Sequence, residues 1–220
     1  MFLPHTMEKD EFIPVMNSAD ASNLFSYLTK TKTSSTERNL DYWDRTFIKA
    51  KDIQESSRNH DEKEKMVKQL SRMLIGREKR ILDLVKKYFT LEDFIEIKER
   101  LIGTGFIGGK SVGMLLARNI LRSDDSINWS DHLELHDSFY IGSDVFYSYI
   151  VQNGWWQDFM SHKAKENYFA LAEKLKRKMF KGKFHDEIKE RFQLMLEYFG
   201  QSPIIVRSSS LLEDAFGNAF

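Results

Sequence analysis

The chain has 220 residues, enough for one large domain or two small ones, and 41% of them are hydrophobic, so a core can form. Its 33 basic and 33 acidic side chains balance, which gives no general attraction to nucleic acids or acidic membranes. The absence of cysteine excludes disulfides and thiolate chemistry. The sequence has neither an apolar run of the roughly 20 residues that span a membrane nor a typical signal peptide. A cytoplasmic, soluble protein that binds neither membranes nor nucleic acids is therefore expected.

The first part of the chain, residues 1–95, predicts a mainly helical region without obvious chemistry. Residues 60–89 predict one long helix, because an apolar stripe recurs there at helical spacing. Gly76 lies in the middle of this stripe and would allow a bend. The pattern Thr90-x-x-Asp93 predicts that a further short helix begins at residue 91.

The stretch GTGFIGGKSVG begins at Gly103 and carries a phosphate-binding pattern. Its first glycine, Gly105 and Gly108 fit the dinucleotide fingerprint G-x-G-x-x-G. That fingerprint needs a buried strand before it and an acid at the end of a second strand about 20 residues later. The preceding EIKERLI is too charged for such a strand, and Asp124 follows a helix-like run. A dinucleotide oxidoreductase therefore lacks its sequence context.

The chemistry of the stretch nevertheless favours an anion. Gly108 and Gly109 let backbone N–H groups approach a ligand closely, and Lys110 adds a mobile positive charge. A helix is predicted to follow, and a glycine loop that enters a helix N-terminus is an anion site. The apolar face of this helix is predicted to consist of Val112, Leu115, Leu116 and Ile120. The alternative is a tight turn packed closely against a neighbouring element.

Shorter elements alternate in the rest of the chain. Residues 139–141 predict a strand, and Ser143 is expected to cap a helix that begins at Asp144. The pair Trp155–Trp156 is expected to pack in the core or at a domain contact. Two further helices are predicted, over residues 164–181 and over the stretch HDEIKERFQLMLEYFG, which Gly200 closes.

A second polar motif stands at the end of a predicted strand. Residues 204–206 predict a buried strand, and RSSSLLED follows it directly. In α/β folds, ligands gather at the carboxyl ends of strands. Arg207 can fork two hydrogen bonds onto phosphate oxygens, and Ser208 and Ser209 can add donors. Glu213 or Asp214 could orient the arginine or contact a metal, although a polar turn with a surface Arg–Glu pair is the alternative.

Two other patterns are interpreted as surface features. The basic residues between Lys174 and Lys183 suit a solvated helix end, and no nucleic-acid-binding module accompanies them. His132 and His136 have a spacing that a metal could use on a helix, but Leu133 stands where a zincin has its glutamate. No metal site is predicted within this sequence.

The two motifs together resemble a known family. GGKS followed by a helix, and VRSSSLLED, resemble the nucleotide motifs of the pyruvate phosphate dikinase and phosphoenolpyruvate synthase family, in the same order. The segment from Phe139 to Ser143 resembles that family's strand and helix start between the motifs. The resemblance covers about residues 100–220. It implies an α/β (α+β) fold in which residues 96–220 form the first lobe of an ATP-grasp-type nucleotide domain, incomplete at the C-terminus.

The resemblance also implies roles for particular residues. Lys110 and Arg207 would contact the ATP phosphates and serve phosphoryl transfer. The residues implied to bind the nucleotide are Gly108, Gly109, Lys110, Ser111, Arg207, Ser208, Ser209 and Glu213. In this family the acids that bind Mg²⁺ and the phosphohistidine domain lie further along the chain, so we expect that these 220 residues alone do not catalyse phosphoryl transfer.

The expected function is ATP binding within a dikinase-type phosphotransferase. Such an enzyme passes a phosphoryl group from ATP through a histidine to pyruvate or another small acceptor. The alternative is a regulatory module that binds a nucleotide or phosphate without catalysis. Neither the acceptor nor the oligomeric state can be read from the sequence.

Overall fold

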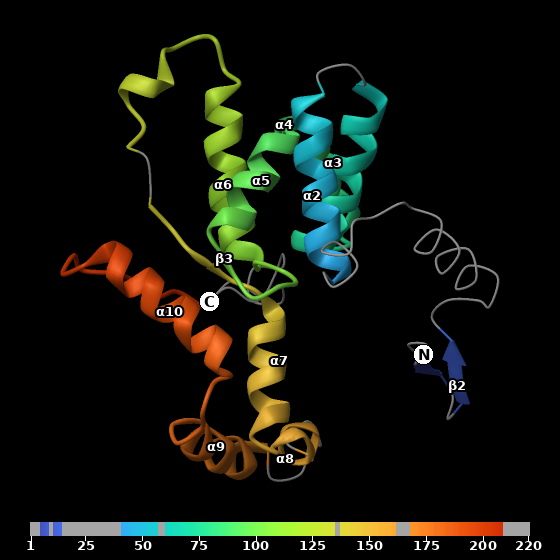
Figure 1. Ribbon diagram of the computed structural model, residues 1–220, viewed down its shortest axis with the longest axis vertical. Coiled ribbons are helices and arrows are strands. Elements are labelled where there is room, and N and C mark those ends of the chain that lie inside the picture. Colours follow the sequence, from blue (N-terminus) through green and yellow to red (C-terminus); the bar gives the residue numbers. More distant parts are fainter. Residues whose placement is uncertain are drawn as a thin grey trace. The chain divides into compact units, whose positions relative to one another are not determined.

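The computed structural model describes most of the chain and is mainly helical (Figure 1). The described ranges are residues 5–8, 11–14, 41–56, 60–134, 137–161 and 168–208. The chain divides into two compact units, residues 1–46 and 47–220, and each is described by itself. In the first unit, β1 (His5–Glu8) and β2 (Glu11–Pro14) pair as an antiparallel hairpin that the sequence did not predict.

Four helices occupy the region between residues 42 and 99. They are α2 (Tyr42–Glu55), which crosses the boundary between the units, α3 (His60–Leu74), α4 (Lys79–Tyr88) and α5 (Leu91–Glu99). The prediction of one long helix over residues 60–89 is wrong, because the chain turns between α3 and α4. Gly76 has a φ angle of 141°, a conformation that ends a helix and that other residues rarely adopt.

The start of α5 confirms the prediction made from Thr90 and Asp93. The Thr90 hydroxyl accepts a hydrogen bond from the Asp93 backbone, and the Asp93 carboxylate accepts one of 2.7 Å from the Thr90 N–H. This reciprocal capping box satisfies two backbone donors that have no partner inside the helix. The helix ends at Glu99, where the chain enters a strand.

A small parallel sheet follows α5. β3 (Leu101–Ile102) pairs with β4 (Tyr140–Ile141), with Leu101 opposite Tyr140. The interpretation that EIKERLI contains no buried strand is therefore wrong for its last two residues, which are buried. The charged residues before them belong to α5, so the strand is too short to show in the composition of the segment.

Of the remaining described helices, two lie between β3 and β4 in the chain and the others follow β4. They are α6 (Gly109–Arg122), the short 3₁₀ helix η2 (Trp129–Asp131), α7 (Ser143–Gln152), α8 (Trp156–Ser161), α9 (Tyr168–Met179) and α10 (Asp186–Phe199). Gly200 ends α10 with a φ angle of 59°, as predicted. With its helices and one parallel strand pair, the second unit is compatible with an α/β fold. None of the helices in the described segments has both the length and the apolar character needed to cross a membrane.

The core of the second unit lies mainly where α3, α4 and α5 pack together, and α4 also contacts α6. α3 contacts both α4 and α5, and α4 contacts α6. The largest fully buried side chains are Phe94, Leu70, Leu74, Ile150 and Val85. All but Ile150 belong to α3, α4 and α5, and α4 of this helical layer packs against α6.

Three predictions about apolar residues are wrong. Trp156 is 41% exposed, because α8 buries none of its side chains. Ile120 is exposed, and Asn119 takes a buried place on α6. Residues 204–206 form no strand, and Ile205 is 87% exposed. An apolar run becomes a buried strand only beside another strand, and none of the described strands pairs with this one.

Replacement of Phe94 tests the helical core. Phe94→Ala is expected to lower the free energy of unfolding by about 3–5 kcal/mol, because a large side chain with 0% exposure is removed from packed surroundings. Phe180→Ala is the matched control, since that ring is 82% exposed; its effect should stay within about 0.5 kcal/mol. Urea unfolding of both variants provides the measurement. Equal effects would contradict this assignment of the core.

Candidate functional site

The first half of the glycine loop is fastened to the start of α7. The Thr104 N–H donates to Asp144 Oδ1 at 2.6 Å, and the Phe106 N–H donates to Ser143 Oγ at 3.0 Å. Backbone bonds run in the opposite sense, from the Ser143 N–H to the Phe106 carbonyl and from the Asp144 N–H to the Thr104 carbonyl. This half of the loop is therefore a turn packed against its neighbour, which is the alternative that the sequence left open.

The glycines in and opposite this turn allow the close approach. Gly103 and Gly105 have φ angles of 75° and 89°, which side chains disfavour. A Cβ atom on Gly105 would overlap the Ser143 hydroxyl, and one on Gly142 would overlap the carbonyl of Thr104. These glycines thus serve packing between the loop and α7.

The role predicted for Ser143 is wrong. Ser143 is the first residue of α7, the N-cap position belongs to Gly142, and no side chain makes a cap hydrogen bond there. The Ser143 hydroxyl instead accepts the hydrogen bond from Phe106. A side chain at a helix start can bond to its own helix or to another segment, and here the glycine loop takes it.

The second half of the loop forms the start of α6. Gly108 occupies the N-cap with a φ angle of 81°, and its carbonyl accepts the first helical hydrogen bond, from Val112. Gly109, Lys110 and Ser111 make up the first turn. The N–H groups of a first turn point along the helix axis and give this end a partial positive charge. Lys110 therefore adds a cationic residue to the first turn at the positive end of α6, although it is not among the residues that line the cavity described next.

A cavity of about 760 Å³ lies beside this helix start. Ser111 lines it from α6 and Arg207 from the segment after α10, so the two sequence motifs meet at one cavity. Most of the remaining wall is apolar. It is built from Ile107, residues 137–141, one side of α10 and residues 203–206. An apolar wall with a few polar groups, at a volume between roughly 300 and 1,000 Å³, is typical of small-molecule sites.

Arg100 holds one wall of the cavity in place. Its guanidinium lies 5.0 Å from the ring centre of Phe139 and 4.7 Å from that of Tyr198 on α10. It also donates hydrogen bonds to Asp137 at 2.9 Å and to the Tyr198 hydroxyl at 3.2 Å. The bond to Tyr198 is the main cause of the raised pKa of Arg100. These contacts connect α10 to the segment that precedes β4.

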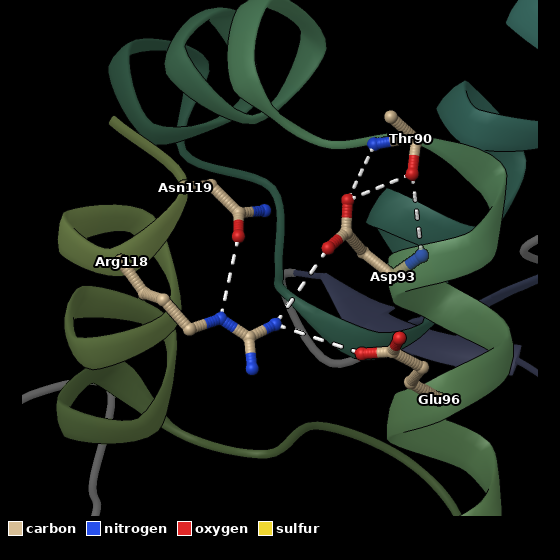
Figure 2. A network of polar contacts seen from close by, with 5 residues as sticks. All are labelled: Thr90, Asp93, Glu96, Arg118 and Asn119. Atoms are coloured by element: carbon tan, nitrogen blue, oxygen red, sulfur yellow. Dashed lines mark hydrogen bonds and ion pairs between the residues drawn. The ribbon is translucent and has the colours of Figure 1, made fainter. Parts of the chain in front are cut away.

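Ion pairs connect α6 to α5 (Figure 2). Arg118 Nη2 lies 3.7 Å from both Asp93 Oδ1 and Glu96 Oε2, and its Nε reaches the buried Asn119. The side chains of Arg118 and Asp93 are only 16% and 14% exposed. Because Asp93 also caps α5, one carboxylate connects the start of α5 to α6. This contact links the second half of α6 to the first two turns of α5.

Comparison with known proteins identifies the family of this site. The family model described as pyruvate phosphate dikinase, AMP/ATP-binding domain, matches residues 104–220. The chain belongs to this family. The match contains the start of α6 and Arg207, so both sides of the cavity lie within an AMP/ATP-binding domain of pyruvate phosphate dikinase type. No curated protein and no solved structure matches the chain.

The structure describes part of the predicted set of nucleotide-binding residues. Gly108, Gly109, Lys110 and Ser111 stand together at the start of α6, with Gly108 buried. Arg207 and Ser208 are exposed. The other two predicted residues, Ser209 and Glu213, lie outside the described residues. Among the described side chains, no group of three His, Cys, Asp or Glu could hold a metal ion; His136 also lies outside them.

Sequence reasoning missed the residues that shape the dikinase-type site without carrying its motifs. Ser143 and Asp144 are predicted only as the start of their own helix, and the sequence analysis assigns no role to Arg100 or Arg118. A signal for the first pair existed, because Gly142, Ser143 and Asp144 form a small, polar junction directly after a strand. The two arginines act through contacts distant in the sequence, for which local spacing gives no signal.

The packing of Gly142 against the glycine loop can be tested with a pair of glycine variants. Gly142→Ala should destabilise the fold by about 1–3 kcal/mol, because the methyl group overlaps the Thr104 backbone. Gly113→Ala, on the open face of α6, should stabilise it by about 1 kcal/mol through helix propensity. Thermal unfolding of both variants measures the difference. Tolerance of alanine at residue 142 would show that the loop and α7 are not in close contact.

Proposed function

We propose that this chain is the ATP-binding part of a dikinase-type phosphotransferase. In this proposal residues 96–220 form the first lobe of an ATP-grasp-type nucleotide domain, and residues 1–95 form a mainly helical region that precedes it and contains the β1–β2 hairpin. The match to an AMP/ATP-binding domain supports ATP as the ligand. The parallel strand pair between helices is compatible with such a lobe.

One observation carries the proposal. Ser111 at the start of α6 and Arg207 after α10 line the same cavity, although they are far apart in the sequence. An anion that sits at this cavity would meet a helix N-terminus from one side and a guanidinium from the other. The apolar wall leaves room for an uncharged part of the ligand, such as a purine.

The proposed chemistry is electrostatic. The first turn of α6 and the Lys110 ammonium would hold the triphosphate, while Arg207 would fork two hydrogen bonds onto phosphate oxygens. As the phosphoryl group leaves, charge shifts along the triphosphate, and fixed cations stabilise that shift without reorganisation. Ser208, Ser209 and Glu213 would complete the phosphate side of the site.

In this proposal, the groups that bind Mg²⁺ and the histidine that accepts the phosphoryl group lie outside the described residues. Mg²⁺, when bound with ATP, would neutralise phosphate charge, but the described side chains offer no group that fits it. The phosphoryl group would pass to a histidine in another domain and then to pyruvate or another small acceptor.

Binding of ATP by variants tests the proposed site. Lys110→Ala and Arg207→Ala should each weaken ATP binding about tenfold or more, because each removes a charged hydrogen bond to phosphate. Lys189→Ala and Arg191→Ala, exposed on α10 and outside the cavity lining, are the matched controls and should bind as the parent chain does. Isothermal titration gives the affinities. Unchanged affinity in both site variants would refute this placement of the phosphates.

The rate of ATP hydrolysis distinguishes a chain that only binds ATP from a complete catalyst. We expect the purified 220-residue chain to bind ATP without enzyme-like hydrolysis, because the proposed phosphohistidine and magnesium-binding acids belong to other parts of the family's enzymes. A phosphate-release assay with the parent chain and Lys110→Ala measures this. Hydrolysis at an enzyme-like rate that Lys110→Ala abolishes would make the expectation wrong.

A further inference from the structure

A second cavity lies between α3 and α4, away from the motifs of the nucleotide site. Its volume is about 450 Å³. Val67 of α3 and Leu82 of α4 contribute apolar surface, and the buried Ser71 lines it from α3. Arg77 lines it from the turn between the two helices. The cavity is therefore a defined hollow within one helical hairpin.

The lining of this cavity is strongly basic, although the chain as a whole is neutral. Two acids, Glu64 and Asp83, stand among five cations. One of the five, Lys86, pairs with Glu64 at 2.6 Å. The other cations, for which the described part of the chain provides no ion-pair partner, are Lys68, Arg72, Arg77 and Lys79.

The pairing of Glu64 determines which cations of the cavity lack a close counter-charge. Helical spacing alone would pair Glu64 with Lys68, one turn along α3. Lys86 on α4 takes the carboxylate instead, and its hydrogen bond is the main cause of the lowered pKa of Glu64. Lys68 keeps only a weaker electrostatic interaction with Glu64, and it lines the cavity with Arg72 and Arg77, which have no ion-pair partner among the described residues. Five cations around one hollow with only two acids leave an excess of positive charge, and an anion bound between them would relieve the repulsion among the cations.

The start of α4 adds a second feature that favours an anion. Lys79, the first residue of this ten-residue helix, lines the cavity. Glu78 occupies the N-cap but makes no side-chain hydrogen bond to the first turn. The N–H groups at this end are therefore not capped by a side chain, and the positive end of the helix dipole adds to the charge of the cations.

We propose that the α3–α4 cavity binds a small, multiply charged phosphate compound. Arg72 and Arg77 would fork hydrogen bonds onto phosphate oxygens, and Lys68 and Lys79 would add point charges. A compact anion fits better than a nucleic acid, because the cations surround one hollow of limited volume. This site is distinct from the proposed ATP site and does not depend on it.

The site also has a physical connection to the glycine loop. The turn that carries Arg77 begins just after Leu74, whose carbonyl accepts a 3.0 Å hydrogen bond from the Ile107 N–H. Ile107 immediately precedes Gly108, the N-cap of α6. An anion that orders the turn between α3 and α4 would therefore act on a segment bonded to the start of α6.

Titration with inorganic tripolyphosphate at physiological salt tests the proposal. The chain should bind this probe, and the double variant Arg72→Ala/Arg77→Ala should weaken binding about tenfold or more, since two charged contacts are lost. The control double variant Arg80→Ala/Arg191→Ala removes the same charge from exposed positions outside the cavity and should leave binding unchanged. Because the probe could also enter the proposed ATP site, each titration is repeated in a Lys110→Ala/Arg207→Ala background, where the same difference should remain.

Two further variants distinguish a shaped site from net charge. Arg72→Lys/Arg77→Lys keeps the charge but loses the forked donors, so it should still weaken binding, and circular dichroism should show an intact helical fold. Glu78→Gln removes the acid next to the helix start and should strengthen binding. The proposal would be overturned if the cavity and control alanine double variants lost tripolyphosphate affinity equally. It would also be overturned if the lysine double variant bound tripolyphosphate with full affinity. Stronger binding of a short RNA than of tripolyphosphate would overturn it as well.

Discussion

The hydrogen bonds between the glycine loop and the start of α7 are the contact on which the rest of the site depends. Thr104 and Phe106 donate their backbone N–H groups to Asp144 and Ser143, and the carbonyls of the same two residues accept in return. This exchange fixes the turn after β3, which ends two residues before Gly108, the N-cap of α6. The loop therefore has two parts with different tasks: the first holds the fold, and the second presents the positive end of a helix.

Three further contacts connect α6 and the cavity wall to neighbouring segments. Arg118 connects α6 to the capped start of α5, and the Ile107 N–H connects the segment before α6 to Leu74 at the end of α3. On the far side of the cavity, Arg100 holds the wall that α10 provides. A binding site set on a fixed helix end loses little freedom when it takes up an anion, which favours binding.

The features predicted correctly from the sequence are those that depend on neighbouring residues. The capping box at Thr90 and the glycine that ends α10 follow from local hydrogen bonding and backbone conformation. Both phosphate-type motifs were found from residue type alone, and their resemblance to the dikinase family agrees with the family match. The errors arise where a distant partner decides the structure. Ser143 bonds to a loop far away in the sequence, and residues 204–206 lack the neighbouring strand that a buried strand requires. Whether residues 96–220 form an ATP-grasp lobe stays a prediction.

The most direct test of this account is the set of backbone amide shifts caused by a non-hydrolysable ATP analogue. The account predicts that the amide signals of Gly109, Lys110 and Ser111 and that of Arg207 move on titration, because these residues border the proposed phosphate position. The amides of Thr104 and Phe106 should move much less, since α7 already accepts their hydrogen bonds. Shifts concentrated at those two residues, with none at the start of α6, would contradict the division of the loop and the site built on it.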